Sequence, residues 1–64
     1  MESSFDFKAT TTDGIEVTAE VKETNVWPKG RIFVNGKLWF EFDEPNFLDA
    51  LDAVMNILHR IDFE

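Results

Sequence analysis

Few side chains in this sequence of 64 residues could take part in covalent or acid–base chemistry. The chain has no cysteine and no tyrosine, and its only serines, Ser3 and Ser4, lie beside the start of the chain, where segments are often loosely held. The single histidine, His59, lies at the border of the polar face of a predicted helix. A general base needs a reactive partner and a pocket, and the pattern offers His59 neither. We therefore expect a protein that is not an enzyme and has no catalytic residues.

Four carboxylates near the predicted helix start could offer oxygen ligands to a hard cation: Asp43, Glu44, Asp49 and Asp52. Their spacing does not match a calcium-binding loop, and one histidine cannot build a zinc site. Acidic side chains at a helix N-terminus are also stabilised without a metal, by about 0.3–1 kcal/mol each, through the helix dipole. The glycines lie in predicted turns and form no phosphate-binding loop. We therefore expect no metal site and no cofactor.

Charge is distributed unevenly along the chain. Acidic residues outnumber basic ones by 13 to 6, for a formal net charge of −7. Residues 1–40 hold six acidic and five basic residues, whereas residues 41–64 hold seven acidic residues and one basic one. A negative field repels phosphate groups, so nucleic acids and anionic membranes are not expected as direct ligands. RNA-binding sheets with exposed aromatic residues have basic surroundings, which this chain lacks.

Alternation of apolar and polar residues predicts a first β-hairpin. Its strands are residues 3–10 and 15–22, and the turn-forming pair Asp13-Gly14 lies between them. The apolar sides of the two strands consist of Phe5, Phe7, Ala9, Ile15, Val17, Ala19 and Val21. Residues 23–30 then predict a loop, because Pro28 and Gly30 are expected to stop regular pairing.

A second hairpin is predicted around Asn35-Gly36, the pair that most strongly favours a two-residue turn. Its strands are residues 31–34 and 37–42. One register has this two-residue turn and pairs Val34 with Lys37. The face that it creates consists of Phe33, Leu38, Phe40 and Phe42.

The alternative register has a three-residue turn with a glycine bulge and pairs Phe33 with Lys37. It places Ile32, instead of Phe33, on the face with Leu38 and the two following phenylalanines. We favour this register, because Arg31, Lys37 and Glu41 then share the outer face. In both registers Trp39 points away from Phe40 and Phe42.

The last predicted element is a helix. Pro45 suits its first turn, and Asn46, three residues before Asp49, resembles a capping box. On a helical wheel the apolar half consists of Phe47, Leu48, Ala50, Leu51, Val54, Met55, Ile57, Leu58 and Ile61. The opposite half carries Asp49, Asp52, Asn56, His59 and Arg60, so one face is predicted to be buried and the other wet.

These elements predict an α+β fold for residues 1–64 as a single domain. Short links between consecutive strands favour a four-stranded antiparallel meander, with the one C-terminal helix packed on one face (ββββα). The N-terminus lacks the pattern of a signal peptide, and no apolar run approaches the roughly 20 residues that cross a bilayer. We therefore expect a cytoplasmic protein.

Aromatic residues on the outer face of the sheet are the first candidate partner-binding feature. Trp39 is predicted there with Phe33 or Ile32 beside it and with Arg31 on the same face, and Trp27 lies in the preceding loop. Exposed tryptophan and arginine are typical anchors of protein interfaces. Alternatively, Trp27 folds over Trp39 and forms a small core that binds no partner.

The acidic helix end is the second candidate. Asp43, Glu44, Asp49 and Asp52, with Asp62 and Glu64 nearby, could present carboxylates to a basic surface, or could simply keep the protein soluble. The hypothesis is a stoichiometric inhibitor or regulator that occludes a basic, nucleic-acid-binding surface of a partner protein, as small phage-encoded mimics of nucleic acids do. The alternative is a homodimeric structural or accessory protein that self-associates through the outer sheet face.

Overall fold

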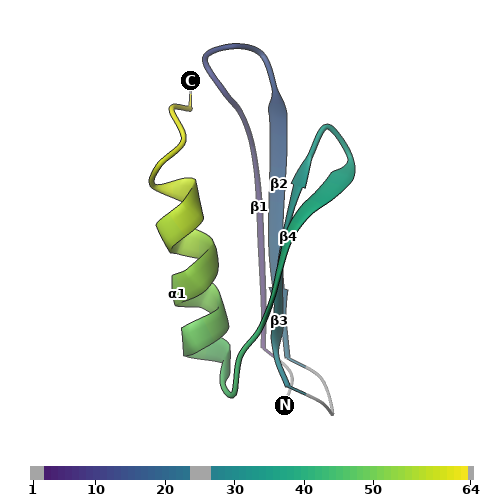
Figure 1. The fold of residues 1–64 in the computed structure, drawn as a ribbon, viewed down its shortest axis with the longest axis vertical. Helices are drawn as coiled ribbons and strands as arrows, with labels where there is room; N and C mark the ends of the chain where they lie inside the picture. Colours follow the sequence, from purple (N-terminus) through teal and green to yellow (C-terminus); the bar gives the residue numbers. More distant parts are fainter. Residues whose placement is uncertain (1–2, 24–26, 64) are drawn as a thin grey trace.

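The computed structural model describes residues 3–23 and 27–63, and it confirms the predicted ββββα architecture (Figure 1). The strands β1–β4 lie side by side in chain order, each antiparallel to the next. Helix α1 covers one face of the sheet. The elements are β1 (Ser4–Thr10), β2 (Glu16–Lys22), β3 (Lys29–Val34), β4 (Lys37–Asp43) and α1 (Phe47–Leu58). Among the described residues, no helix has the length and apolarity needed to cross a membrane.

The core lies between α1 and the two central strands. Its buried side chains are Val17, Ala19, Val21, Ile32, Ala50, Val54 and Leu58. The predicted alternation of the first hairpin is confirmed, because every second residue of β1 and β2 faces the helix. The helical wheel predicted Leu48 on the buried, apolar half of the helix. This prediction is wrong, because Leu48 is 73% exposed.

The prediction that Gly30 stops regular strand pairing is wrong. Gly30 lies inside β3, opposite Val21 of β2 and Phe42 of β4. The reason is the close approach of the helix. A Cβ atom at Gly30 would lie 2.7 Å from Cγ2 of Val54 and 3.3 Å from the backbone oxygen of Ala50. Glycine in a strand often marks such an approach, and here it sets the distance between α1 and the sheet.

Helix α1 begins with the predicted capping interaction. Asn46 is the N-cap residue, and its Oδ1 accepts a hydrogen bond from the backbone N–H of Asp49 at 2.9 Å. The Asn46 Nδ2 donates to Oδ2 of Asp49 at 3.0 Å. Pro45 precedes the cap and does not lie in the first turn, so that detail of the prediction is wrong.

The favoured register of the second hairpin is wrong. Asn35 and Gly36 have φ values of 50° and 84°, which fit a two-residue type I′ turn, and Val34 pairs with Lys37. The register then shifts between Phe33, which pairs with Leu38, and Ile32, which pairs with Phe40. Neither predicted register includes this bulge. As a result, Leu38 shares the outer face with Phe33, whereas Phe40 and Phe42 face the helix with Ile32.

Candidate functional site

The bulge places Trp39 on the helix side of the sheet. In a β-bulge two residues of one strand lie opposite one residue of the other, and here Trp39 is the extra residue between Leu38 and Phe40. Its ring meets the Phe40 ring edge-on at 5.6 Å between centroids. The predictions that Trp39 points away from Phe40 and lies on the outer face are therefore wrong. Trp39 is not covered by the helix, because 66% of its surface is exposed.

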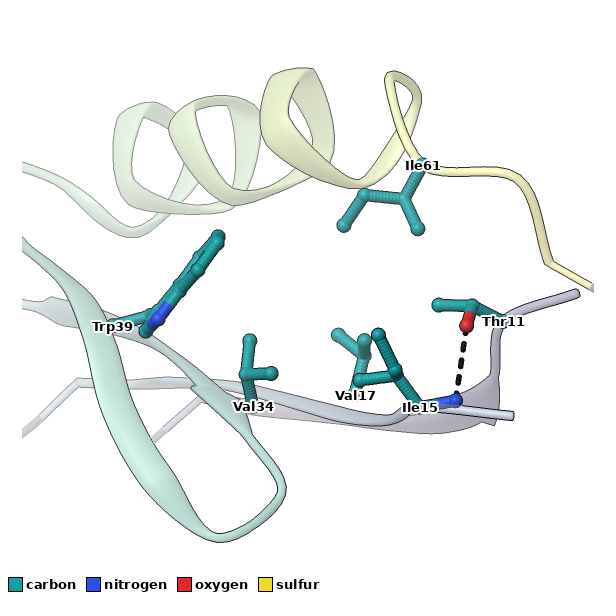
Figure 2. Close-up of a pocket in the computed structure, with 6 residues that line it drawn as sticks. All are labelled: Thr11, Ile15, Val17, Val34, Trp39 and Ile61. Carbon is teal, nitrogen blue, oxygen red and sulfur yellow. Dashed lines mark hydrogen bonds between the residues drawn. The ribbon is translucent and has the colours of Figure 1, made fainter. Parts of the chain in front are cut away.

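Trp39 forms one wall of an apolar pocket of about 160 Å³ (Figure 2). The pocket lies between the sheet and the segment that follows α1, near the tip of the β3–β4 hairpin, which leans away from the helix (Figure 1). Its lining consists of Thr11, Ile15, Val17, Val34, Trp39 and Ile61. The only side-chain polar group of the lining outside Trp39, the hydroxyl of Thr11, accepts the N–H of Ile15 at 3.0 Å. An apolar cavity of about 150 Å³ can hold a benzene-sized group.

The chain segment after the helix holds the pocket in place. Thr11 forms an isolated antiparallel bridge with Phe63, and the N–H of Thr12 donates to the backbone oxygen of Asp62 at 3.1 Å. The rings of Phe7 and Phe63 meet edge-on, with centroids 5.4 Å apart. These contacts join residues about fifty positions apart, and no local pattern indicates them. The sequence pattern therefore indicated Trp39, one wall of the pocket, but not the residues around it.

The outer sheet face is an array of ion pairs and not the predicted aromatic surface. Arg31 lies opposite Glu20 on β2 and Glu41 on β4. Its Nε lies 2.7 Å from Oε2 of Glu41, and its Nη1 lies 3.6 Å from Oε1 of Glu20. The hydrogen bond with Glu41 raises the pKa of Arg31, and the same bond lowers the pKa of Glu41. Lys8 pairs with Glu16, Lys22 with Glu20, and Lys29 with Asp43. Phe33 is half-buried in this face, beside Thr18 and Leu38.

Trp27 is 62% exposed and lies at the other end of the β3–β4 ladder. It precedes Pro28, whose backbone oxygen accepts the N–H of Glu44 at 3.2 Å. Glu44 lies five positions after Trp39 along the chain, which corresponds to about 16 Å at 3.3 Å per residue. Trp27 therefore does not fold over Trp39, and the interpretation of a small aromatic core is wrong.

The predicted acidic helix end is only partly assembled. Asp49 and Asp52 are exposed on α1, and Glu44 is half-buried before it. Asp43 is drawn onto the outer sheet face by Lys29, at 3.6 Å. Asp62 lies at the opposite end of the twelve-residue helix, beside Thr12, so it does not join this group. Glu64 lies outside the described residues.

The part of the chain that the structure describes contains no group of three or more His, Asp or Glu side chains placed to hold a metal ion. His59 is exposed at the end of α1, where its backbone N–H donates to the oxygen of Met55 at 2.9 Å. Among the described residues, we take the apolar pocket and the β4 strand beside it as the candidate binding site. Comparisons with models of protein families, with curated proteins and with solved structures give no match to this chain.

Proposed function

We propose that this chain is a small acidic protein-binding module that acts without catalysis and occludes a basic, nucleic-acid-binding surface of a partner protein. The observation that supports it best is an exposed tryptophan at the wall of an apolar pocket. Interface hot spots are enriched in tryptophan and cluster in pockets from which water is excluded. The pocket is large enough for one apolar side chain of a partner.

The distribution of charge supports a basic partner. Four of the six basic residues form ion pairs on the outer sheet face, where they neutralise four carboxylates. Among the described residues, the acidic side chains without an ion pair are Asp6, Asp13, Glu23, Glu44, Asp49, Asp52 and Asp62. A net negative charge of this size accelerates and orients association with a basic surface, whereas buried aromatic contacts determine how long the complex lasts.

The size of the molecule allows one interface to include both tryptophans. A standard interface buries about 800 Å² on each partner, which is about one sixth of the 4560 Å² surface of the described chain. A patch of that area is wider than the roughly 16 Å of strand between Trp39 and the segment beside Trp27. The pocket, β4 and the acidic helix start can therefore meet one partner together.

The outer sheet face gives less support to the alternative of a homodimer formed through that face. Leu38 is its most exposed large apolar residue, at 51%, and the Arg31–Glu41 ion pair lies in the next row of the same face. Two copies would also bring net charges of −7 together, which opposes association.

The test starts with capture of partners on the immobilised chain and measures association and dissociation rates of the captured protein. Trp39→Ala is expected to accelerate dissociation at least about tenfold, which corresponds to about 1.4 kcal/mol. Trp27→Ala is the matched control, because this tryptophan is similarly exposed but does not belong to the lining of the Trp39 pocket, and its effect should be smaller. Asp49→Lys with Asp52→Lys should slow association at low salt more than Asp13→Lys with Asp62→Lys, which changes the net charge equally.

Occlusion is measured by adding nucleic acid to the complex, which should release the chain. A captured protein without a basic surface would contradict the proposal. So would simultaneous binding of chain and nucleic acid, or dissociation rates that Trp39→Ala leaves unchanged.

A further inference from the structure

The two edges of the sheet differ in the side chains that they expose. On β1 the outer positions carry Asp6 and Lys8, of opposite charge, and the chain beyond this strand is bridged to Phe63. On β4 the exposed residues include Leu38 at 51%, Trp39 at 66% and Phe40 at 38%. Edge strands are usually protected by charges or by a covering segment, because their free backbone groups can pair with another strand. β4 is thus the edge strand that exposes large apolar side chains.

The backbone groups that β4 leaves free can be identified. The N–H of Glu44 donates to the oxygen of Pro28, and hydrogen-bonded pairs alternate with non-hydrogen-bonded pairs along an antiparallel ladder. Phe42 therefore directs its N–H and C=O toward Gly30 of β3, whereas Glu41 and Asp43 direct theirs away from the sheet. The bulge at Trp39 limits this regular stretch to the residues from Phe40 to Asp43.

Charges on this edge indicate what could pair with it. Across the outer face, Glu20, Arg31 and Glu41 lie opposite one another on three successive strands, so the sign alternates and the row ends on a carboxylate. The Lys29–Asp43 pair likewise ends on a carboxylate. Opposite charges across neighbouring strands stabilise a sheet, and like charges destabilise it. A fifth strand should therefore present basic side chains at two alternate positions.

The helix side of the same stretch requires apolar side chains. Phe40 and Phe42 face this side with stacked rings, 6.1 Å apart, and Phe40 is 38% exposed. Since the residues of a strand alternate between its faces, an incoming strand would place apolar side chains over these rings and basic ones opposite Glu41 and Asp43. A second copy fits poorly, because antiparallel pairing of two β4 strands through these residues places carboxylates against carboxylates.

From this geometry we propose that β4 binds an extended segment of the partner, with alternating basic and apolar residues, as a fifth strand of the sheet. The inference rests on the proposed function and specifies its mode of binding. Main-chain hydrogen bonds at Glu41 and Asp43 supply the contact, and the alternation of side chains supplies the specificity.

Amide hydrogen exchange measured by NMR tests this pairing directly. The probe is a six-residue synthetic peptide of alternating lysine and valine, with a peptide of alternating glutamate and valine as the control. At saturating lysine peptide, exchange of the Glu41 and Asp43 N–H groups should slow by about tenfold or more. The N–H groups of Asp6 and Lys8 on the β1 edge should be unaffected, and the glutamate peptide should have no effect.

A backbone variant separates main-chain pairing from charge attraction. The chain is short enough for chemical synthesis, and N-methylation of Glu41 removes the outward donor while the contact of its carboxylate with Arg31 remains. N-methylation of Glu41 should abolish binding of the lysine peptide. N-methylation of Asp6 should not, although its N–H also points away from the sheet, because the hydrogen bond from Glu23 to Ser3 places Asp6 in a non-hydrogen-bonded pair of β1 and β2. Should the methylated chain fail to fold, exchange in the unmodified chain decides the question.

Three results would overturn the inference. The first is no binding of the lysine peptide at millimolar concentration, and the second is a change of chemical shifts at Asp49 and Asp52 without slower amide exchange at Glu41. The third is slow amide exchange in β4 that depends on the protein concentration in the absence of peptide. The last result would identify a second copy as the occupant. Each of these can occur while Trp39→Ala still weakens binding of a captured partner, so failure of the strand pairing and failure of the proposed function are distinguishable.

Discussion

Replacing Gly30 by alanine tests the closest approach between the helix and the sheet. The added Cβ would lie 2.7 Å from Cγ2 of Val54, inside normal contact distance, and 3.3 Å from the backbone oxygen of Ala50. Val54 is fully buried, and valine has few alternative rotamers. The side chain therefore cannot move aside, and α1 has to shift away from β3.

The expected cost follows from two opposing effects. Overpacking of a core by one methyl group destabilises by about 1–3 kcal/mol. Replacing glycine stabilises by about 0.4–1 kcal/mol, because alanine restricts the unfolded chain. The net loss is about 1–2 kcal/mol, which is a large part of the roughly 3–10 kcal/mol expected for a chain of this length. In a domain this small it lowers the Tm by about 5–15 °C.

Urea and thermal unfolding followed by circular dichroism give this loss, and a double-mutant cycle identifies its cause. Val54→Ala alone should destabilise by leaving a cavity. In the Gly30→Ala/Val54→Ala protein the new methyl group occupies part of that cavity. The stability loss of the double variant should therefore be smaller than the sum of the losses of the two single variants, by about 0.5 kcal/mol or more. A neutral Gly30→Ala substitution, or additive effects of the two substitutions, would refute the close contact between Gly30 and Val54 as the cause.

Two further predictions concern the helix start and the outer sheet face. Asn46→Ala removes the acceptor of the Asp49 N–H and should lower the free energy of unfolding in urea by about 0.5–2 kcal/mol. Asn56→Ala, at an exposed position within α1, is the control and should lower it much less. Equal losses of stability in the two variants would contradict the capping role of Asn46. The pKa of Glu41 is lowered chiefly by its hydrogen bond with Arg31, so its stabilising contribution is present above the unfolded-state pKa and lost as the pH falls through the folded-state pKa. Arg31→Gln should raise the pKa of Glu41 in an NMR titration of its carboxylate, and an unchanged titration would show that the pair is not formed in solution.

Much of the fold follows from local pattern. Alternation of apolar residues locates β1 and β2, and Asn46 with Asp49 marks the start of α1, because these features depend on side chains a few residues apart. Gly30 could not be placed this way. Its role as a strand residue depends on Val54 and Ala50, which join it only when the helix packs on the sheet.

The bulge at Trp39 reconciles two requirements that each predicted register met only in part. Asn35-Gly36 demands a two-residue turn, whereas the core demands that Ile32, Phe40 and Phe42 share a face. One extra residue in β4 satisfies both, so this conflict in the sequence was the available indication of the bulge. The pocket had no such indication, because Thr11 and Ile61 reach it through contacts between distant parts of the chain.

The acidity of the chain helps to explain how β4 can stay exposed without pairing with a second copy. An open edge with apolar residues on both faces is prone to pair with copies of itself. Beyond the bulge, the residues whose backbone groups point away from the sheet are Glu41 and Asp43. Pairing of two β4 strands would bring these carboxylates against each other. In addition, two molecules that each carry a net charge of −7 repel each other at longer range. The same charges attract a basic segment. The edge can therefore remain open for a partner without assembling the chain into fibres.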